Sequence, residues 1–247
     1  MTAGTARPTG AAVGSRRSGA WLLWPMLALT FSTGVVDAVG YLGLDRVFVG
    51  NMTGNVVVLG MAVAGAEDLP VLGPALAFLA FLAGAALGGR VLRGQPAAWT
   101  ARTTVLLSSV GVVVAGCAIT LLALDVHPAS SDHPGPRWLL TVTCLLAAAM
   151  GVQAGVARTL AVKDVTTVVV TSTMTALAAE STLGAGSGGT AWRRRAGAIV
   201  LIALGALAGA GLLRVHLGAG LGLAALIVLG TAVGGHLAAR RREHATP

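Results

Sequence analysis

Six apolar runs of about 20 residues each constrain this chain more than any other feature, because a helix of that length can cross the hydrocarbon core of a bilayer. Hydrophobic residues make up 55% of the 247 residues and charged residues 11%, and the mean hydropathy is +0.82. This composition exceeds what a soluble domain needs for its core, so the sequence predicts an all-α integral membrane protein. The predicted spans lie near 21–44, 70–90, 103–124, 137–158, 196–213 and 217–239.

Two further segments, 47–65 and 164–180, are apolar but rich in polar side chains. The first contains the sequence FVGNMTGN, and the second reads DVTTVVVTSTMTALAAE. An unpaired amide or peptide group in lipid costs several kcal/mol, so protein or water must face these residues. The chain therefore has either eight spans or six spans with two irregular elements.

The basic residues separate these two models, because cytoplasmic loops of membrane proteins carry an excess of Arg and Lys. With six spans and a cytoplasmic N-terminus, 14 of the 17 basic residues lie inside and only 3 outside (Arg46, Arg137 and Arg214). With eight spans, 10 lie inside and 7 outside. Six spans fit better, which places both termini in the cytoplasm and makes 47–65 and 164–180 re-entrant or broken helices.

The second half of the sequence resembles the first. Thr53, Gly54 and Asn55 align with TST at 171–173, GVVDAVGYLGLDR aligns with GVQAGVARTLAVKD, and FLAGAALGGR aligns with GALAGAGLLR. An odd number of crossings per half makes the two halves inverted in the membrane. The sequence thus predicts one transmembrane domain, 21–239, built from two inverted three-helix repeats, 21–124 and 137–239, each with a re-entrant or broken polar helix. Chance similarity between segments rich in Ala, Gly and Val is the alternative.

The polar residues of the two irregular elements are candidates for a solute or ion pathway. A helix that begins inside the membrane exposes unpaired N–H groups and the positive end of its dipole, and nearby Thr or Asn side chains can cap those groups or bind a solute. The alternative is that these side chains bond only to each other and to the backbone. The candidates are Asn51, Thr53 and Asn55 in the first element and Thr167, Thr171 and Thr173 in the second.

Asp37 is the only acidic residue well inside an apolar run, and Gln153 occupies a comparable depth in the second half. A carboxyl group in the membrane is costly and usually faces a cavity or a partner. Helical spacing puts Asp37 on one face with Thr33, Gly34 and Tyr41. Asp37 and Gln153 therefore join the candidate pathway, with proton coupling as the role of Asp37. The alternative is a protonated structural acid bonded to a neighbour.

The segments outside the spans point to no further domain. Residues 1–20 are small, polar and basic and predict a disordered cytoplasmic tail, and 240–247 predict a second one. No catalytic, phosphate-binding or paired-cysteine motif is present, and the histidines lie at span ends or beyond. The basic residues sit in clusters between spans rather than on one face, which argues against nucleic acid as a partner. We expect no enzyme activity, no metal and no cofactor.

The segments TGVVDAVGYLGLDRVFVGNMTGNVVVLG and GVQAGVARTLAVKDVTTVVVTSTMTALAAE resemble the two hallmark motifs of the YoaK-like family of bacterial membrane proteins, a domain of unknown function. The resemblance covers residues 20–240. It implies a multi-span protein of the bacterial inner membrane and names no substrate. We expect a transporter of a small solute, with the lipid bilayer and that solute as partners. A scaffold or channel-like protein without active transport is the alternative, and assembly as a homo-oligomer is left open.

Overall fold

The computed structural model describes residues 20–44, 46–66, 69–126, 137–160, 174–175, 177–178 and 190–244. Seven α-helices and one 3-10 turn have defined bounds in these ranges, and the same ranges contain no strand. The elements are η1 (Ala20–Leu22), α2 (Leu23–Gly43), α3 (Met52–Val63), α4 (Leu72–Val91), α5 (Ala101–Ala123), α6 (Leu139–Leu160), α8 (Thr190–Leu212) and α9 (Leu217–Glu243).

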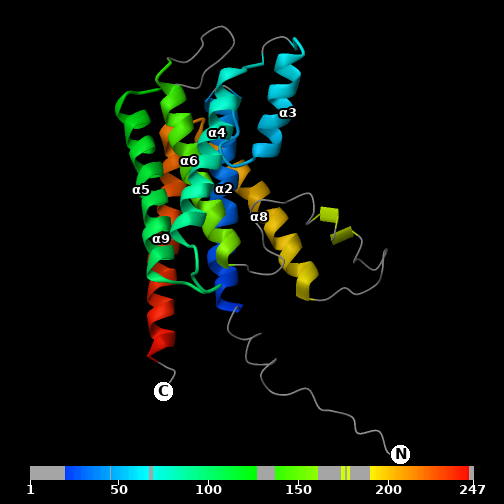
Figure 1. Cartoon of the computed structure of the whole chain (residues 1–247). Coiled ribbons are helices and arrows are strands. Elements are labelled where there is room, and N and C mark those ends of the chain that lie inside the picture. Colours follow the sequence, from blue (N-terminus) through cyan, green and yellow to red (C-terminus); the bar gives the residue numbers. More distant parts are fainter. Residues whose placement is uncertain are drawn as a thin grey trace, which may run out of the picture.

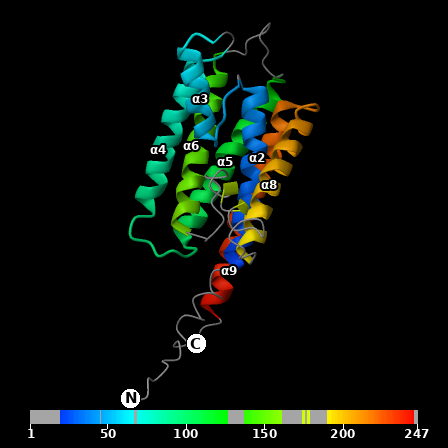
Figure 2. The same ribbon diagram turned by 90° about the vertical axis from the view of Figure 1, so that its right-hand side faces the viewer.

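Six of these helices are long and apolar enough to cross a membrane, namely α2, α4, α5, α6, α8 and α9. The six predicted spans are thereby confirmed. The helices form one bundle in which consecutive long helices run in opposite directions (Figure 1). Both ends of the described chain lie at the same end of this bundle (Figures 1 and 2). We call that end proximal and the opposite end distal.

The seventh helix, α3, does not run the length of the bundle. It has 12 residues and is therefore about 18 Å long, well short of the thickness of a hydrocarbon core. After α2 reaches the distal end, the non-helical segment 46–51 leads back toward the middle of the bundle, and α3 then returns to the distal end (Figures 1 and 2). On its way it packs against α4.

The long helices pair across the two halves of the sequence. The three most extensive contacts are α4 with α6, α5 with α9, and α2 with α8, and each joins a helix before residue 124 to one after residue 137. The contacts of α2 with α9 and of α5 with α6 come next. One core of buried apolar side chains runs through these interfaces, with Leu29, Leu107, Leu146 and Leu221 among its fully buried members.

Glycines bring the paired helices into backbone contact. A methyl group added at Gly84 of α4 would overlap the carbonyl of Ala148 in α6, and one at Gly205 of α8 would overlap the carbonyl of Phe31 in α2. Small residues at such crossings are how membrane helices approach closely without a hydrophobic driving force. The Ala- and Gly-rich runs of the sequence therefore act as helix contacts.

The last helix extends beyond its predicted end. The apolar run ends near residue 239, but α9 continues to Glu243, and its 27 residues span about 40 Å, which exceeds the hydrocarbon core. Its last turn carries Arg240, Arg241 and Arg242, whose charges favour the negative end of the helix dipole. The guanidinium of Arg242 lies 5.3 Å from the ring centroid of Trp21, and this cation–π contact holds the end of α9 against η1.

Candidate functional site

Asp37 is the residue around which the break between α2 and α3 is organised. Its Oδ1 accepts three hydrogen bonds from consecutive backbone N–H groups, those of Val49 at 3.1 Å, Gly50 at 2.7 Å and Asn51 at 3.3 Å. These groups precede or begin a helix and have no helical partner of their own. The carboxyl group thus supplies the hydrogen bonds that the non-helical backbone lacks, and its negative charge suits the positive end of the α3 dipole.

The two asparagines of the FVGNMTGN sequence complete this arrangement. Asn51 is the N-cap of α3, and its Oδ1 accepts from the N–H of Gly54 at 3.2 Å. Asn55 is buried, and its amide pairs with both sides of Phe48: Oδ1 accepts from the Phe48 N–H at 2.9 Å, and Nδ2 donates to the Phe48 carbonyl at 2.5 Å. Side chains therefore satisfy the N–H groups of residues 48–51 and the carbonyl of Phe48.

One face of α2 receives the returning segment. Gly40 lies so close to this segment that an added Cβ would sit 2.6 Å from the Val47 carbonyl oxygen. At Gly50 an added Cβ would lie 3.2 Å from Thr33 and 3.4 Å from the Asp37 carboxylate. Thr33, Asp37 and Gly40 follow each other at helical spacing, so they form one face of α2, and segment 46–51 packs against this face.

Gln153 of α6 joins the same region through Thr33. Its Nε2 donates to the Thr33 hydroxyl at 3.2 Å, and that hydroxyl donates to the Leu29 carbonyl at 2.8 Å. Because the Thr33 proton is already used, the amide nitrogen and not the oxygen must face Thr33. Gln153 is 1% exposed, and its Oε1 has no hydrogen-bond partner within the described residues. Thr33 thus links Gln153 of α6 to the face of α2 that also carries Asp37.

A cleft of about 400 Å³ lies beside Asp37 between α2 and α8. Asp37 and Tyr41 line it from α2, Phe48 from the returning segment, and Ile202 and Ala206 from α8. The rings of Tyr41 and Phe48 stack with their centroids 4.6 Å apart and their planes inclined by 24°. Sequence analysis placed Tyr41 on the Asp37 face but did not single out Phe48, because only the fold brings the two rings together.

The remaining predicted site residues divide into two groups. Asn51 and Thr53 are exposed, and neither lines the cleft beside Asp37. Thr167, Thr171 and Thr173 lie outside the described residues, as does most of the second polar element, so their assignment to the pathway stays a prediction. The structure therefore brings together Asp37, Asn51, Asn55 and Gln153 around one break.

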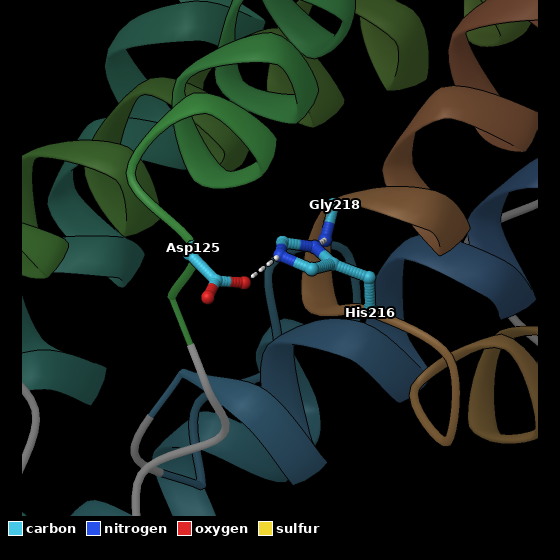
Figure 3. A network of polar contacts seen from close by, with 3 residues as sticks. All are labelled: Asp125, His216 and Gly218. Atoms are coloured by element: carbon cyan, nitrogen blue, oxygen red, sulfur yellow. Dashed lines mark hydrogen bonds and ion pairs between the residues drawn. The ribbon is translucent and has the colours of Figure 1, made fainter.

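A second polar cluster lies at the distal end, where α5 ends and α9 begins. His216 is the N-cap of α9, and its Nδ1 accepts from the N–H of Gly218 at 3.0 Å (Figure 3). Its Nε2 lies 3.3 Å from the Oδ1 of Asp125 without the alignment of a hydrogen bond; because Nδ1 accepts, the ring is neutral and carries its proton on Nε2, toward the carboxylate. This cluster is separate from the break at Asp37 and links two helix ends.

The fold defines a multi-pass helical membrane protein in which a non-helical segment separates α2 from the short helix α3. A model of the family described as "Protein of unknown function (DUF1275)" matches residues 25–234, so the chain belongs to that family. The UPF0700 transmembrane protein YoaK of Bacillus subtilis (strain 168) is 27% identical over 150 residues, which cover 60% of this chain and 62% of that relative. The predicted resemblance is confirmed. No solved structure matches the chain.

Proposed function

We propose that this protein is a membrane transporter of a small solute, that it carries out no enzymatic reaction, and that Asp37 couples the transport to protons. The observation that carries the proposal is the break at 46–51, whose backbone is bonded to a buried carboxyl group beside a cleft. Non-helical backbone is tolerated at membrane depth only where protein or a watery cavity surrounds it. Many transporters form their binding sites at breaks of this kind.

On this proposal α3 is a re-entrant half-helix that enters and leaves at the distal face. Its short length and its return to the distal end support this assignment (Figure 2). Asp37 lies six residues before the end of α2, which puts it about 9 Å from that end. The middle of the 21-residue α2 is Thr33, about 6 Å from Asp37, so the carboxyl group would lie in the distal half of the membrane but nearer to the midplane than to the distal face.

The pattern of helix contacts supports the inverted repeat. In an inverted repeat α2, α4 and α5 would correspond to α6, α8 and α9, so each contact between helices should have a symmetry-related counterpart. The counterpart of the α2–α8 contact is α6–α4, and that of α2–α9 is α6–α5; both counterparts are present. The α5–α9 contact is its own counterpart.

The glycine contacts repeat in the same way. Gly34 approaches the backbone of α8 as Gly151 approaches that of α4, and Gly84 approaches α6 as Gly205 approaches α2. These contacts pair Gly84 with Gly205, whereas the alignment of FLAGAALGGR with GALAGAGLLR pairs it with Ala208. The packing thus favours aligning α4 with α8 about one helical turn away from the sequence alignment. The reason is that a close helix contact requires a glycine at the point of backbone approach.

The orientation follows from the charge distribution and belongs to the same proposal. The proximal end carries the clusters of basic residues at 90–102, 193–195 and 240–242, so we assign it to the cytoplasm of a bacterial cell, with both termini inside. The distal end, with α3 and the loop before α6, would face outward.

Proteoliposomes with an internal pH-sensitive dye test the transporter proposal. The expected result is that one solute class, from a panel of amino acids, sugars, carboxylates and organic cations, produces a proton flux across the membrane that the dye reports. Asp37→Asn should abolish this coupling to protons, while exchange at equal pH should persist at saturating solute concentrations. Thr120→Ala is the control, because its hydroxyl bonds only the carbonyl of Gly116 within its own helix. Absence of movement for every class would favour the scaffold alternative.

A further inference from the structure

Asp37 is an acidic side chain in the wall of the cleft between α2 and α8, and the described residues supply it with no countercharge. Among the described residues no basic side chain lies within ion-pairing distance of Asp37, and its three hydrogen bonds all go to Oδ1. Oδ2 has no partner in that part of the chain, and Asp37 contributes to the wall of the cleft. An unpaired carboxylate at this depth is costly, so a positive charge delivered by a ligand would be stabilised there.

Two aromatic residues line the same cleft as Asp37. Tyr41 and Phe48 stack on each other, and both line the cleft together with Asp37. Aromatic faces attract organic cations through their quadrupoles, and the attraction strengthens where water is excluded. A carboxyl group with neighbouring rings is a combination suited to a substituted ammonium group or another diffuse organic cation.

The opposite wall offers no polar contact. It is formed by α8 with Ile202, Ala203, Ala206 and Ala210, none of which carries a polar side chain. A sugar or a free amino acid would leave its hydroxyl or carboxylate groups unpaired against this wall. An apolar substituent would instead bury its surface there.

We propose that the cleft binds an organic cation that carries an apolar group, with the charge at Asp37, the ring faces of Tyr41 and Phe48 beside it, and the apolar group against α8. This inference rests on the proposed transport function and names its substrate class. It excludes anions and strongly hydrated neutral solutes as primary ligands of this cleft.

Equilibrium binding of radiolabelled tetraphenylphosphonium to the purified full-length protein in nanodiscs tests the proposal. We expect saturable binding that benzyltrimethylammonium displaces and phenylacetate does not, since the latter carries a similar ring with the opposite charge. Asp37→Asn keeps an acceptor for the three N–H groups but removes the charge, and should weaken binding by about tenfold or more. Phe48→Leu should weaken binding by about threefold.

A matched pair of variants on α8 makes the test independent of whether Asp37→Asn folds. Ala203→Phe fills the cleft from its exposed rim and should abolish binding. Leu204→Phe adds an aromatic ring at the next residue, which is exposed and does not line the cleft, and should leave binding unchanged. Non-saturable binding, displacement by phenylacetate, or equal binding by both variants would overturn the proposal.

The two proposals fail in distinguishable ways. Transport of another solute class in proteoliposomes without tetraphenylphosphonium binding would overturn the cation site and leave the transporter proposal standing. Saturable, Asp37-dependent binding without transport of any cation would support the site and contradict the transporter proposal.

Discussion

Asp37 shows how one side chain can replace the hydrogen bonds of a missing helical turn. Its Oδ1 accepts from three backbone N–H groups of segment 46–51, and the Asn55 amide pairs with both the N–H and the carbonyl of Phe48. The sequence predicted the importance of Asp37 because a deep acid is rare in a span. The sequence could not predict which backbone N–H groups donate to Asp37, because these depend on where the chain turns back after α2.

The first prediction separates the hydrogen-bonding role of Asp37 from its charge. Asp37→Asn retains an Oδ1 acceptor, so we expect a melting temperature close to that of the unmodified protein. Asp37→Leu leaves the N–H groups of Val49, Gly50 and Asn51 unpaired, and should lower the free energy of unfolding by about 3 kcal/mol or more. Tryptophan fluorescence during thermal unfolding in detergent measures both. Equal melting temperatures for the two variants would contradict the assigned role of Oδ1.

The second prediction concerns the cap at the start of α9. His216→Ala removes the acceptor of the Gly218 N–H and should cost about 1 kcal/mol, whereas His216→Asn supplies another good N-cap and should restore most of it. Amide hydrogen exchange in the first turn of α9 reports the difference directly. If His216→Asn exchanged as fast as His216→Ala, the contact with Asp125 rather than the cap would be the stabilising interaction.

At the scale of the elements, hydrophobic length predicted the six long helices, and polar content identified 47–65 as irregular. Both follow from the bilayer, which demands about 20 apolar residues per span and satisfied backbone groups. The sequence could not tell a broken span from a re-entrant helix, since both have the same composition. The structure adds that α3 starts only at Met52, after a non-helical stretch bonded to α2.

The third prediction tests the glycine contacts between helices. Gly84→Ala and Gly205→Ala would each press a methyl group into the backbone of the partner helix, and each should lower the free energy of unfolding by about 2 kcal/mol. Gly89→Ala and Gly211→Ala on the same two helices meet nothing within 4 Å and should be neutral or slightly stabilising. Thermal unfolding of the four variants checks this. A similar loss of stability in Gly89→Ala and Gly211→Ala would show that replacing glycine destabilises these helices wherever it lies, and not through contact with the partner helix.

At the scale of the whole molecule, the pairing of helices was beyond the reach of sequence patterns. Apolar periodicity is weak in a span that is apolar on every side, so the faces of α4 and α8 give little indication of their partners. Self-comparison of the sequence predicts that the halves correspond, which stays a prediction; it could not give the register that the backbone approaches of Gly84 and Gly205 favour for such a correspondence.

The fourth prediction concerns the orientation of the bundle. Arg93 lies near the proximal end of α4 and Ala66 follows the distal end of α3, and both are exposed. In a background without Cys117 and Cys144, Arg93→Cys and Ala66→Cys should react with a membrane-impermeant thiol reagent from opposite sides. Ala66→Cys should label in intact spheroplasts and Arg93→Cys only in inverted vesicles. Labelling of both from one side would contradict the six-span topology.

The pairing of α2 with α8 has a consequence for how the chain is made. Among the helices with defined bounds α2 is synthesised before the others, yet its most extensive partner begins only at Thr190, after α3, α4, α5 and α6. It is also the least apolar of the six long helices and carries Asp37. The least apolar long helix is therefore made well before the helix with which it packs most extensively, so we expect α2 to insert less efficiently in a truncated chain that lacks α8 than in the full chain.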